Sequence, residues 1–554
     1  MQRITRHLPL ILLASAALVV TLIGAAVFRF LTDDAYIAFR YISNAHLGFG
    51  YVWNAAPFRP VEGYTSFLWV VLLDGIWRVT GTQPPDVAGT ISLLCSLGTL
   101  AVTGSLAWQV LKRIPAVTVR GLLTGLVVVG IATNRTFLTW TGSGLETALF
   151  NVLLQGWVLA AVLWQKRRPA GAVWLTALAS LLTLTRPDGL LFLAATIAIT
   201  APALSGRRSD WSRRNRLLVA LPLAVPVAHL IWRRGFYGEW LPNTFYAKVP
   251  GLWPAAGLRY LWSFVLEYGL WFGAALVVWA LLRSRRNLTA DALRPWRWSP
   301  ISWAVATVLA HAGFYVIVVG GDHFEYRVFS QLVPLGWVAL LWATSRLQLP
   351  TGRATAVLVV AALVAIPVPW SHWAATRHLQ TRQQTLKMTV PLAPRWPAPV
   401  RWYARAFDDS QAWLIARFIC CRHQEHKINL QFIRELVPPR ARGSRVRDDD
   451  GYPVMVFPAV GYVSWVLPHV NIIDTHGLND YVVARLPIQV DGTRHMAHDR
   501  LAPRAYTDCF RPNVVLDGYR KVKLIPRETP LVADDIIACE KKWTARAAKL
   551  SRKP

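Results

Sequence analysis

The chain is short of acidic residues: 30 Asp and Glu stand against 60 Lys and Arg, which gives a net charge of +30 over 554 residues. Such an excess of positive charge first suggests nucleic-acid binding. The distribution of the charge argues against it, because much of it lies in short loops between apolar stretches, as in the cytoplasmic loops of membrane proteins. The rest lies in the C-terminal third, where anionic lipid or a lipid-linked phosphate is the expected partner.

Cysteine is also scarce, with five residues in the chain. None of the spacings resembles a zinc site, and the pair His495 and His498 lacks the carboxylate spacing that would support a metal centre. Cys95 lies in an apolar stretch, where it is expected to act as a small hydrophobic residue. If the C-terminal third lies outside the cytoplasm, one or two disulfides are expected there. The four cysteines concerned are Cys420, Cys421, Cys509 and Cys539.

Apolar residues are abundant, at 54% of the chain with 27 Trp. Several stretches of about 18–24 residues carry almost no charge, which is enough to cross a bilayer. The first is too long for an ordinary signal peptide and lacks a cleavage-site pattern, so we expect an uncleaved anchor. Eleven spans are expected, at about residues 8–29, 88–111, 118–135, 146–164, 170–186, 188–204, 216–232, 263–282, 299–319, 328–345 and 354–371.

The basic loops predict the orientation of these spans. Loops such as Lys112-Arg113, Lys166–Arg168, Arg207-Arg208 and Arg283–Arg286 are expected inside, which starts the chain inside and leaves the C-terminal region outside. The apolar stretch Ser66–Arg78 contains charged residues and breaks this parity. We therefore expect it to be an interfacial or re-entrant helix in the first outer loop, the alternative being twelve crossings.

After about residue 375 the hydrophobic runs shorten and proline becomes frequent. The sequence predicts a transmembrane catalytic domain over residues 1–375, a linker over 376–400 and an extracytoplasmic α/β domain over 401–554, of ordinary domain size. Within the last part, an amphipathic helix is expected at Trp402–Phe418 and short strands at Val454–Phe457 and Val470–Asp474.

Two adjacent carboxylates, Asp33 and Asp34, follow the first span at its outer end. Paired acids at a membrane surface repel each other and are costly to desolvate, so they indicate proton abstraction, metal ligation or cation capture. The alternative is a helix N-cap with its neighbour. We expect Asp33 to act as the base and Asp34 to support it.

Most acidic residues of the membrane half fall on the same outer side. Together with nearby cations they predict a cavity open to the outer leaflet, in which a carboxylate removes a proton from an acceptor hydroxyl and a cation neutralises a departing phosphate. For any one of these residues, an ion pair that only stabilises the fold is the alternative. The candidate substrate-binding residues are Arg40, Arg59, Glu62, Glu146, Asp188, Asn243, Tyr246, Lys248, Asp322, His323 and Arg327.

Two further loops contribute candidates. The run Gly320-Gly321-Asp322-His323 combines a flexible backbone with a titratable pair, although a plain turn is the alternative. In the C-terminal region, a glycine-bearing turn with polar neighbours suits acceptor or carbohydrate contacts, while a solvated loop explains it equally well. Its candidate residues are Asp474, His476, Asn479 and Asp480.

In this order, the motifs resemble those of GT-C fold glycosyltransferases, most of all the terminal arabinofuranosyltransferases of bacterial cell-wall arabinan and related enzymes that modify pilin. The resemblance is carried by Thr32–Ile37, Arg59–Ser66, Ser143–Thr147, Arg186–Gly189, Leu241–Lys248, Gly320–His323 and Ile473–Arg485. It implies a polytopic helical membrane protein of the GT-C fold, with about eleven spans and a C-terminal soluble domain. It also implies that Asp33 or Asp34 is the catalytic carboxylate.

The resemblance further implies a polyprenyl-phosphate donor of D-arabinofuranose, a glycan or pilin-like acceptor, and chemistry outside the bacterial cytoplasmic membrane. No cofactor is required by the pattern, with a divalent cation as an open alternative and nucleic acid excluded as a partner. A mannosyl, other hexosyl or protein O-glycosyltransferase is the nearest alternative. A lipid or sugar transporter is the alternative from another class, but transporters often carry inverted repeats, and the sequence shows none.

Overall fold

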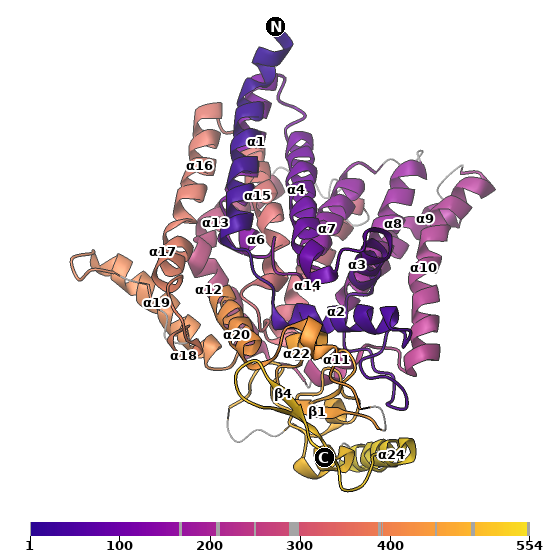
Figure 1. The fold of residues 1–554 in the computed structure, drawn as a ribbon. Coiled ribbons are helices and arrows are strands. Elements are labelled where there is room, and N and C mark those ends of the chain that lie inside the picture. Colours follow the sequence, from indigo (N-terminus) through magenta and orange to yellow (C-terminus); the bar gives the residue numbers. More distant parts are fainter. Residues whose placement is uncertain are drawn as a thin grey trace.

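The computed structural model describes residues 2–164, 169–205, 211–248, 251–286, 299–385, 389–390, 392–448, 451–488 and 493–550. Helices dominate, and Figure 1 shows most of the long ones side by side in a bundle with the N-terminus at one end. These long helices are α1 (Gln2–Val27), α4 (Pro84–Val110), α5 (Val117–Ala132), α7 (Thr147–Val162), α8 (Pro169–Thr185), α9 (Leu190–Leu204), α10 (Arg213–Tyr237), α12 (Pro254–Tyr268), α13 (Leu270–Arg286), α14 (Pro300–Gly313), α15 (Leu332–Arg346) and α16 (Thr351–Val364).

The prediction of a polytopic helical membrane protein is confirmed. Among the described residues, seven helical segments are long and apolar enough to cross a membrane, and a bent pair makes up to eight. Three shorter apolar helices, α5, α7 and α8, coincide with predicted spans. The total of eleven stays a prediction. Of the basic loops, residues 166–168 and 207–208 lie outside the described residues.

The predicted span at 263–282 falls on two helices. α12 and α13 pass together as one candidate span, but they meet at an angle of 97°. The break falls at Gly269, which ends α12 with a left-handed φ of 57°. Glycine adopts this conformation without steric cost, so it ends the helix and lets the chain turn sharply.

Shorter helices lie at the end of the bundle away from the N-terminus. In Figure 1, α2 (Asp33–His46) runs crosswise beneath the long helices, and α3 (Phe67–Thr80) follows it. With 14 residues, α3 is about 21 Å long, less than the ~30 Å of a bilayer core, as expected for the non-crossing Ser66–Arg78 stretch. The other short elements are α6 (Arg135–Thr139), η1 (Pro187–Gly189), α11 (Asn243–Lys248), the π-helix η4 (Phe314–Val319), η5 (Arg327–Phe329) and α17 (Pro367–Thr376).

The C-terminal part lies against this end of the bundle (orange to yellow in Figure 1). Strands β1 (Val454–Phe457) and β2 (Asn471–Asp474) pair in parallel, and both were predicted. Strands β3 (Val514–Leu516) and β4 (Val522–Leu524) form a separate antiparallel pair. The helices are α18 (Arg382–Thr385), α19 (Ala398–Ile415), α20 (His423–Leu436), α21 (Arg440–Gly443), α22 (Val460–Val466), η6 (Val483–Arg485), α23 (Arg504–Thr507), η7 (Asp508–Phe510) and α24 (Ala533–Leu550). A disulfide joins Cys509 and Cys539, and Cys95, Cys420 and Cys421 take no part in it.

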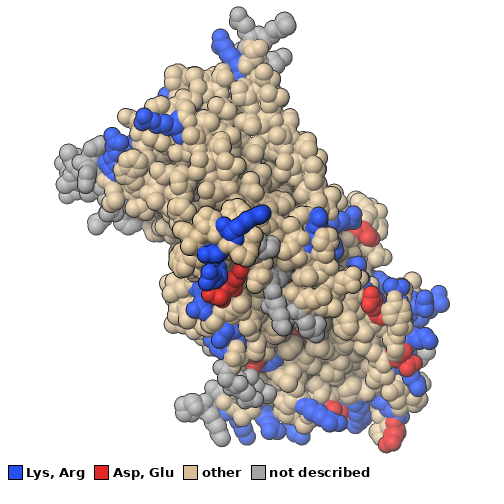
Figure 2. All heavy atoms as spheres, turned by 90° about the vertical axis from the view of Figure 1, so that its left-hand side faces the viewer, with Lys and Arg blue, Asp and Glu red and all other residues tan. Residues whose placement is uncertain are grey.

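Charge is unevenly spread over the face shown in Figure 2. Lys, Arg, Asp and Glu side chains gather over the lower part, where the C-terminal elements lie, and a few cations mark the opposite end. A broad uncharged band separates the two, and such a band is what a bilayer would cover.

The two parts of the chain share their hydrophobic cores. One cluster packs Tyr36 and Phe39 of α2 against Val463 and Trp465 of α22. A second cluster joins α5 and α12 to Leu414 and other residues of the C-terminal part. The predicted domain limits therefore stay predictions, because hydrophobic packing is continuous across them.

Arg40 connects the two parts most directly. Its side chain is buried, and it donates hydrogen bonds to the carbonyl oxygens of Trp53, Ser464, Leu467 and Val470 at 2.9–3.1 Å. Three of these acceptors belong to the C-terminal part. A planar guanidinium with five N–H donors suits this fan of carbonyls.

We expect Arg40→Met to destabilise the protein by roughly 3 kcal/mol or more, because several buried carbonyls lose their donor at once. The measurement is thermal unfolding of the purified protein in detergent. The matched control is Arg445→Met, at an exposed arginine after α21, which should leave the melting temperature nearly unchanged. Equal melting temperatures for both variants would contradict this role of Arg40.

Stability should also depend on pH. Burial raises the pKa of Glu62 to about 7, of Asp480 to about 6 and of Glu540 to about 7. A carboxyl with a raised folded-state pKa stabilises the fold below its ordinary pKa near 4, and this stabilisation is lost as pH rises through 6–7. These three carboxyls should therefore lower the melting temperature as pH rises from 5 to 8.

Glu540→Gln should flatten part of this pH dependence, since it removes one of the titrating groups. Glu435→Gln, on the exposed face of α20, is the control and should leave the slope as it is. A pH dependence of the melting temperature that is the same in Glu540→Gln and in the unmodified protein would contradict this contribution.

Candidate active site

A cavity of about 360 Å³ opens where the N-terminus of α2, the loop before α3, α11 and the loop after η4 come together. One side is apolar, with Leu190, Leu191, Phe245, Phe314 and Val319. The other side is charged. Its charged and titratable residues are Asp34, Glu146, Arg186, Asp188, Lys248, Asp322, His323 and Arg327. Seven of these eight were predicted as site residues, and Arg186 was expected as one of the cations near them.

Asp34 lies in the first turn of α2 and faces the cavity. The helix begins there because the Thr32 side chain accepts a hydrogen bond from the Ala35 N–H. An Asp34 carboxylate oxygen lies 4.0 Å from Lys248 Nζ, and about a third of the Asp34 side chain (32%) is exposed. Burial disfavours its charge, but Lys248, His323, Arg327 and His426 outweigh this effect and lower the pKa of Asp34. Asp34 is therefore ionised at neutral pH.

Asp33 is held differently. Its carboxylate accepts the N–H groups of Gly461 at 3.0 Å and Tyr462 at 2.7 Å, at the start of α22. Burial, opposed by these two bonds and reinforced by the Asp34 charge, raises the pKa of Asp33 to about 6. Asp33 does not line the cavity. Of the two adjacent acids, Asp34 thus lines the cavity, and Asp33 is bound by the backbone of α22.

Arg186 lines the cavity and binds two of its acids. It donates to Glu146 at 2.9 Å and to Asp188 at 3.1 Å, so both acids are paired. Asp188 also accepts the Tyr315 hydroxyl at 2.6 Å and lies 2.8 Å from His311 Nε2. His311 and Tyr315 were not predicted, although their four-residue spacing across α14 and η4 puts both on one helix face. Glu146 and Asp188 orient Arg186 toward the cavity.

The loop of residues 320–327, hereafter the cavity loop, forms the remaining charged wall. Gly320 and Gly321 have left-handed φ values of 88° and 107°, which end η4 and turn the chain. Arg327 binds Asp322 in a bidentate ion pair at 2.8 and 3.1 Å. The ring of His323 donates through Nδ1 to the carbonyl of Phe418 at 2.7 Å, which leaves Nε2 as the acceptor nitrogen.

Five predicted substrate-binding residues lie outside the cavity, because their side chains are used to hold the fold. Arg40 is bound by carbonyls as described above. Glu62 is buried against Arg233, with oxygen–nitrogen distances of 2.6 and 3.1 Å. Arg59 stacks on the Tyr481 ring at 3.4 Å.

The last two of the five lie on α11. The Asn243 side-chain amide donates to the carbonyls of Gly477, Leu478 and Asp480. The Tyr246 hydroxyl donates to Glu239 at 3.2 Å. α11 therefore uses Asn243 and Tyr246 on the side away from the cavity and Lys248 toward it.

The four C-terminal candidates stabilise their own loop. Asp474 accepts the N–H groups of His476, Gly477 and Asn479, a pattern typical of an Asx-type turn. The His476 ring donates to the Arg500 carbonyl at 3.1 Å. Asp480 accepts the Tyr506 hydroxyl at 2.8 Å. None of them lines the cavity, but Leu478, Met496 and Ala497 of the same region do.

A divalent cation does not fit the described part of the chain. No group of three or more His, Cys, Asp or Glu side chains there is arranged to hold a metal ion. The cavity acids are instead paired with arginine or lysine.

No family model matches the chain. Two curated relatives are both named terminal beta-(1->2)-arabinofuranosyltransferase. The relative from Mycobacterium tuberculosis is 30% identical over 385 residues, which cover 63% of this chain and 58% of the relative. The relative from Corynebacterium glutamicum is 29% identical over 346 residues, covering 55% of this chain and 46% of the relative. The chain thus spans about half the length of these relatives.

Two solved structures match the chain more distantly. ArnT from Cupriavidus metallidurans, bound to undecaprenyl phosphate, matches with a TM-score of 0.49 and 13% identity over 83% of this chain and 85% of its own. The Archaeoglobus fulgidus oligosaccharyltransferase matches with a TM-score of 0.45 and 13% identity, over 83% and 64%. The resemblance predicted from the motifs is confirmed by the curated relatives: over more than half its length, the chain is similar to terminal arabinofuranosyltransferases.

Proposed function

We propose that the protein is a membrane glycosyltransferase that moves D-arabinofuranose from a polyprenyl-phosphate donor to a glycan or protein acceptor, outside the bacterial cytoplasmic membrane. Three observations support this proposal. The relatives carry the name of such a transferase. The apolar helices make the chain a membrane protein. The cavity combines an apolar side with a charged one at the end of the bundle.

The observation that carries the proposal is the position of Asp34. It is an ionised carboxylate at the cavity surface, with Lys248 4.0 Å away and Arg327 contributing to the same local field. The other cavity acids are engaged in shorter arginine pairs of 2.8–3.1 Å. Asp34 is therefore the cavity carboxylate whose oxygens lack a short ion pair and can contact an acceptor hydroxyl.

In the proposed step, the carboxylate of Asp34 removes the proton from an acceptor hydroxyl. The hydroxyl oxygen forms a bond to the anomeric carbon of the sugar, and the bond from that carbon to the phosphate oxygen breaks. The polyprenyl phosphate leaves with the bonding electron pair, and the proton stays on Asp34. Lys248, Arg327 and Arg186 line the same cavity and would neutralise the phosphate charge as it develops.

The apolar side of the cavity suits the lipid part of the donor. Leu190 and Leu191 begin α9, and Phe314 and Val319 belong to η4. Both elements belong to candidate membrane spans. A polyprenyl chain entering from the bilayer would contact these side chains, with its phosphate toward the cations and its sugar toward Asp34.

We expect Asp34→Asn to lower kcat by roughly 100-fold or more, the usual contribution of a general base, while the donor KM changes less than about threefold. The assay is transfer from synthetic polyprenyl-phosphoryl arabinofuranose to an arabinan acceptor by the purified protein. Asp86→Asn is the matched control, at an exposed acid in the first turn of α4, and should retain full activity. Unchanged turnover in Asp34→Asn, or transfer from a hexosyl donor but not from the pentosyl donor, would contradict the proposal.

Lys248→Met should weaken donor binding by about 10-fold or more, since a charge-assisted contact to the phosphate is lost. It should also raise the pKa of Asp34, whose charge Lys248 helps to stabilise, and so shift the acid limb of the pH–kcat profile upward. Lys427→Met, at an exposed residue of α20, is the control. If the donor KM and the acid limb of the pH–kcat profile were the same as in the unmodified protein, Lys248 would have no role in the site.

A further inference from the structure

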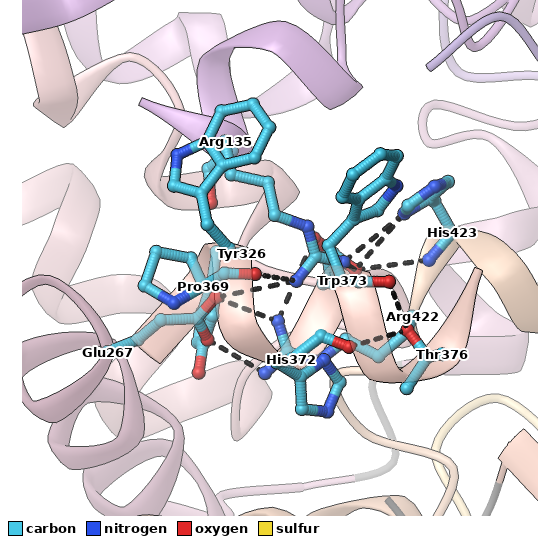
Figure 3. A network of polar contacts seen from close by, with 12 residues as sticks. Arg135, Glu267, Tyr326, Pro369, His372, Trp373, Thr376, Arg422 and His423 are labelled. Atoms are coloured by element: carbon cyan, nitrogen blue, oxygen red, sulfur yellow. Dashed lines mark hydrogen bonds and ion pairs between the residues drawn. The ribbon is translucent and has the colours of Figure 1, made fainter. Parts of the chain in front are cut away.

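A buried group of four charged side chains lies beside the active-site region, and the proposed reaction does not use it. Arg135, Glu267, Glu325 and Arg422, hereafter the charge cluster, are each 0% exposed at the side chain. Arg422 binds both oxygens of Glu267, at 3.0 and 2.7 Å. Arg135 binds Glu325 at 3.1 Å, and a second Glu325 oxygen lies 3.7 Å from Arg422. The cluster is electrically balanced (Figure 3).

The members come from four separate parts of the fold. Arg135 begins α6, Glu267 lies at the end of α12, Glu325 belongs to the cavity loop, and Arg422 is the N-cap residue of α20. In Figure 3, Arg135 and Arg422 approach each other beside Glu267 and His423. The cluster therefore ties a cavity wall to two elements of the membrane half and to one of the C-terminal part.

The cavity loop also pairs along its backbone with residues 418–423, hereafter the docking segment. The N–H of Cys420 donates to the Asp322 carbonyl at 2.9 Å, and that of Cys421 to the His323 carbonyl at 2.8 Å. In return the Glu325 N–H donates to the Cys421 carbonyl at 3.0 Å. Each segment of the pair sets the register of the other.

Side chains close the same junction. A Glu325 carboxylate oxygen accepts the His423 N–H at 3.1 Å, next to its bond from Arg135. Arg422 Nε donates to the Gln411 side chain of α19 at 3.1 Å. Burial disfavours the charge of Glu325, but Arg135 and Arg422 outweigh it and hold the pKa of Glu325 well below its usual range. The ion pairs thus persist at every pH at which the enzyme would work.

We propose that Glu325 and Arg422 are positioning residues: through the charge cluster they fix the register of the cavity loop on the docking segment, and so set the positions of Asp322, His323 and Arg327 in the active site. The assignment of those three residues as active-site groups rests on the proposed function. The register itself does not depend on which reaction the cavity carries out.

Backbone conformation supports a positioning role over a merely stabilising one. Tyr326, Phe418 and Cys420 have φ values of 43°, 55° and 60°, in a left-handed region that side chains other than glycine seldom adopt. Such residues persist where the surroundings over-determine them. A buried ion-pair group adds little net stability compared with apolar packing, but it accepts only one arrangement of its partners.

The test is hydrogen–deuterium exchange of Arg422→Gln, followed by mass spectrometry of peptides over residues 318–330 and 416–424. We expect exchange in both peptides to accelerate about 10-fold or more, while peptides from α4 and α7 keep their protection. The matched control is Arg442→Gln, at an exposed arginine of α21, which should exchange like the unmodified protein. Unchanged protection of both peptides in a folded Arg422→Gln protein would overturn the proposal.

A second variant covers the case in which Arg422→Gln fails to fold. Glu267→Gln combined with Arg422→Gln removes one acid and one base, so the cluster stays balanced and no bare buried charge remains. The same acceleration in both peptides is expected from the double variant. Full protection in the double variant would equally overturn the proposal.

Kinetics separate this inference from the proposed function. In Arg422→Gln we expect kcat to fall about 10- to 100-fold, because small displacements of catalytic groups cost this much. The donor KM should change less than about threefold, since Lys248 and Arg186 are held by other elements, and Arg422→Lys should recover part of kcat. If exchange accelerates in Arg422→Gln while the unmodified protein transfers no pentose, the positioning role is supported and the proposed reaction is rejected. A pure KM effect would reject the positioning role.

Discussion

The rest of the structure depends on the buried polar contacts between the C-terminal part and the end of the helical bundle on which it packs. Arg40 donates to carbonyls of the C-terminal part, Asn243 to the loop around Gly477, and the amides of Gly461 and Tyr462 bind Asp33. Each contact satisfies a polar group that would otherwise be buried without a partner. The bundle alone would leave these groups unsatisfied, so the cavity is complete only when both parts are packed together.

Asp33 and Asp34 show how this packing separates two chemically identical neighbours. One carboxylate is bound by backbone amides of α22 and is easier to protonate than usual, while the other faces lysine and arginine and is harder to protonate. Adjacent acids with opposite shifts are a common way to divide a supporting role from a proton-accepting one. The division comes from tertiary contacts rather than from the local sequence.

The sequence allowed the membrane class, most helix positions, both strands of the parallel pair and most of the charged cavity wall to be predicted. Long uncharged stretches and basic loops are strong signals of membrane spans and of their orientation. Acids at the same end of several spans come close together once the spans pack side by side. The prediction failed for Arg40, Glu62 and Asn243, whose partners are carbonyls or side chains far along the chain. Residue type and local spacing are the same whether an arginine binds a phosphate or four backbone carbonyls, so only the folded structure distinguishes the two.

The positions of several cavity-lining residues depend on the π-helical turn η4 at Phe314–Val319. A π turn accommodates one residue more than an α turn. Here the wider turn brings Phe314, Tyr315 and Val319 to the cavity together. Removing one residue from it would restore regular winding and rotate one flank of the helix by about 100° relative to the other, so that the apolar and hydroxyl groups could no longer share a face. The shape of the lipid-facing wall thus depends on chain length at this one turn as much as on the identity of its side chains.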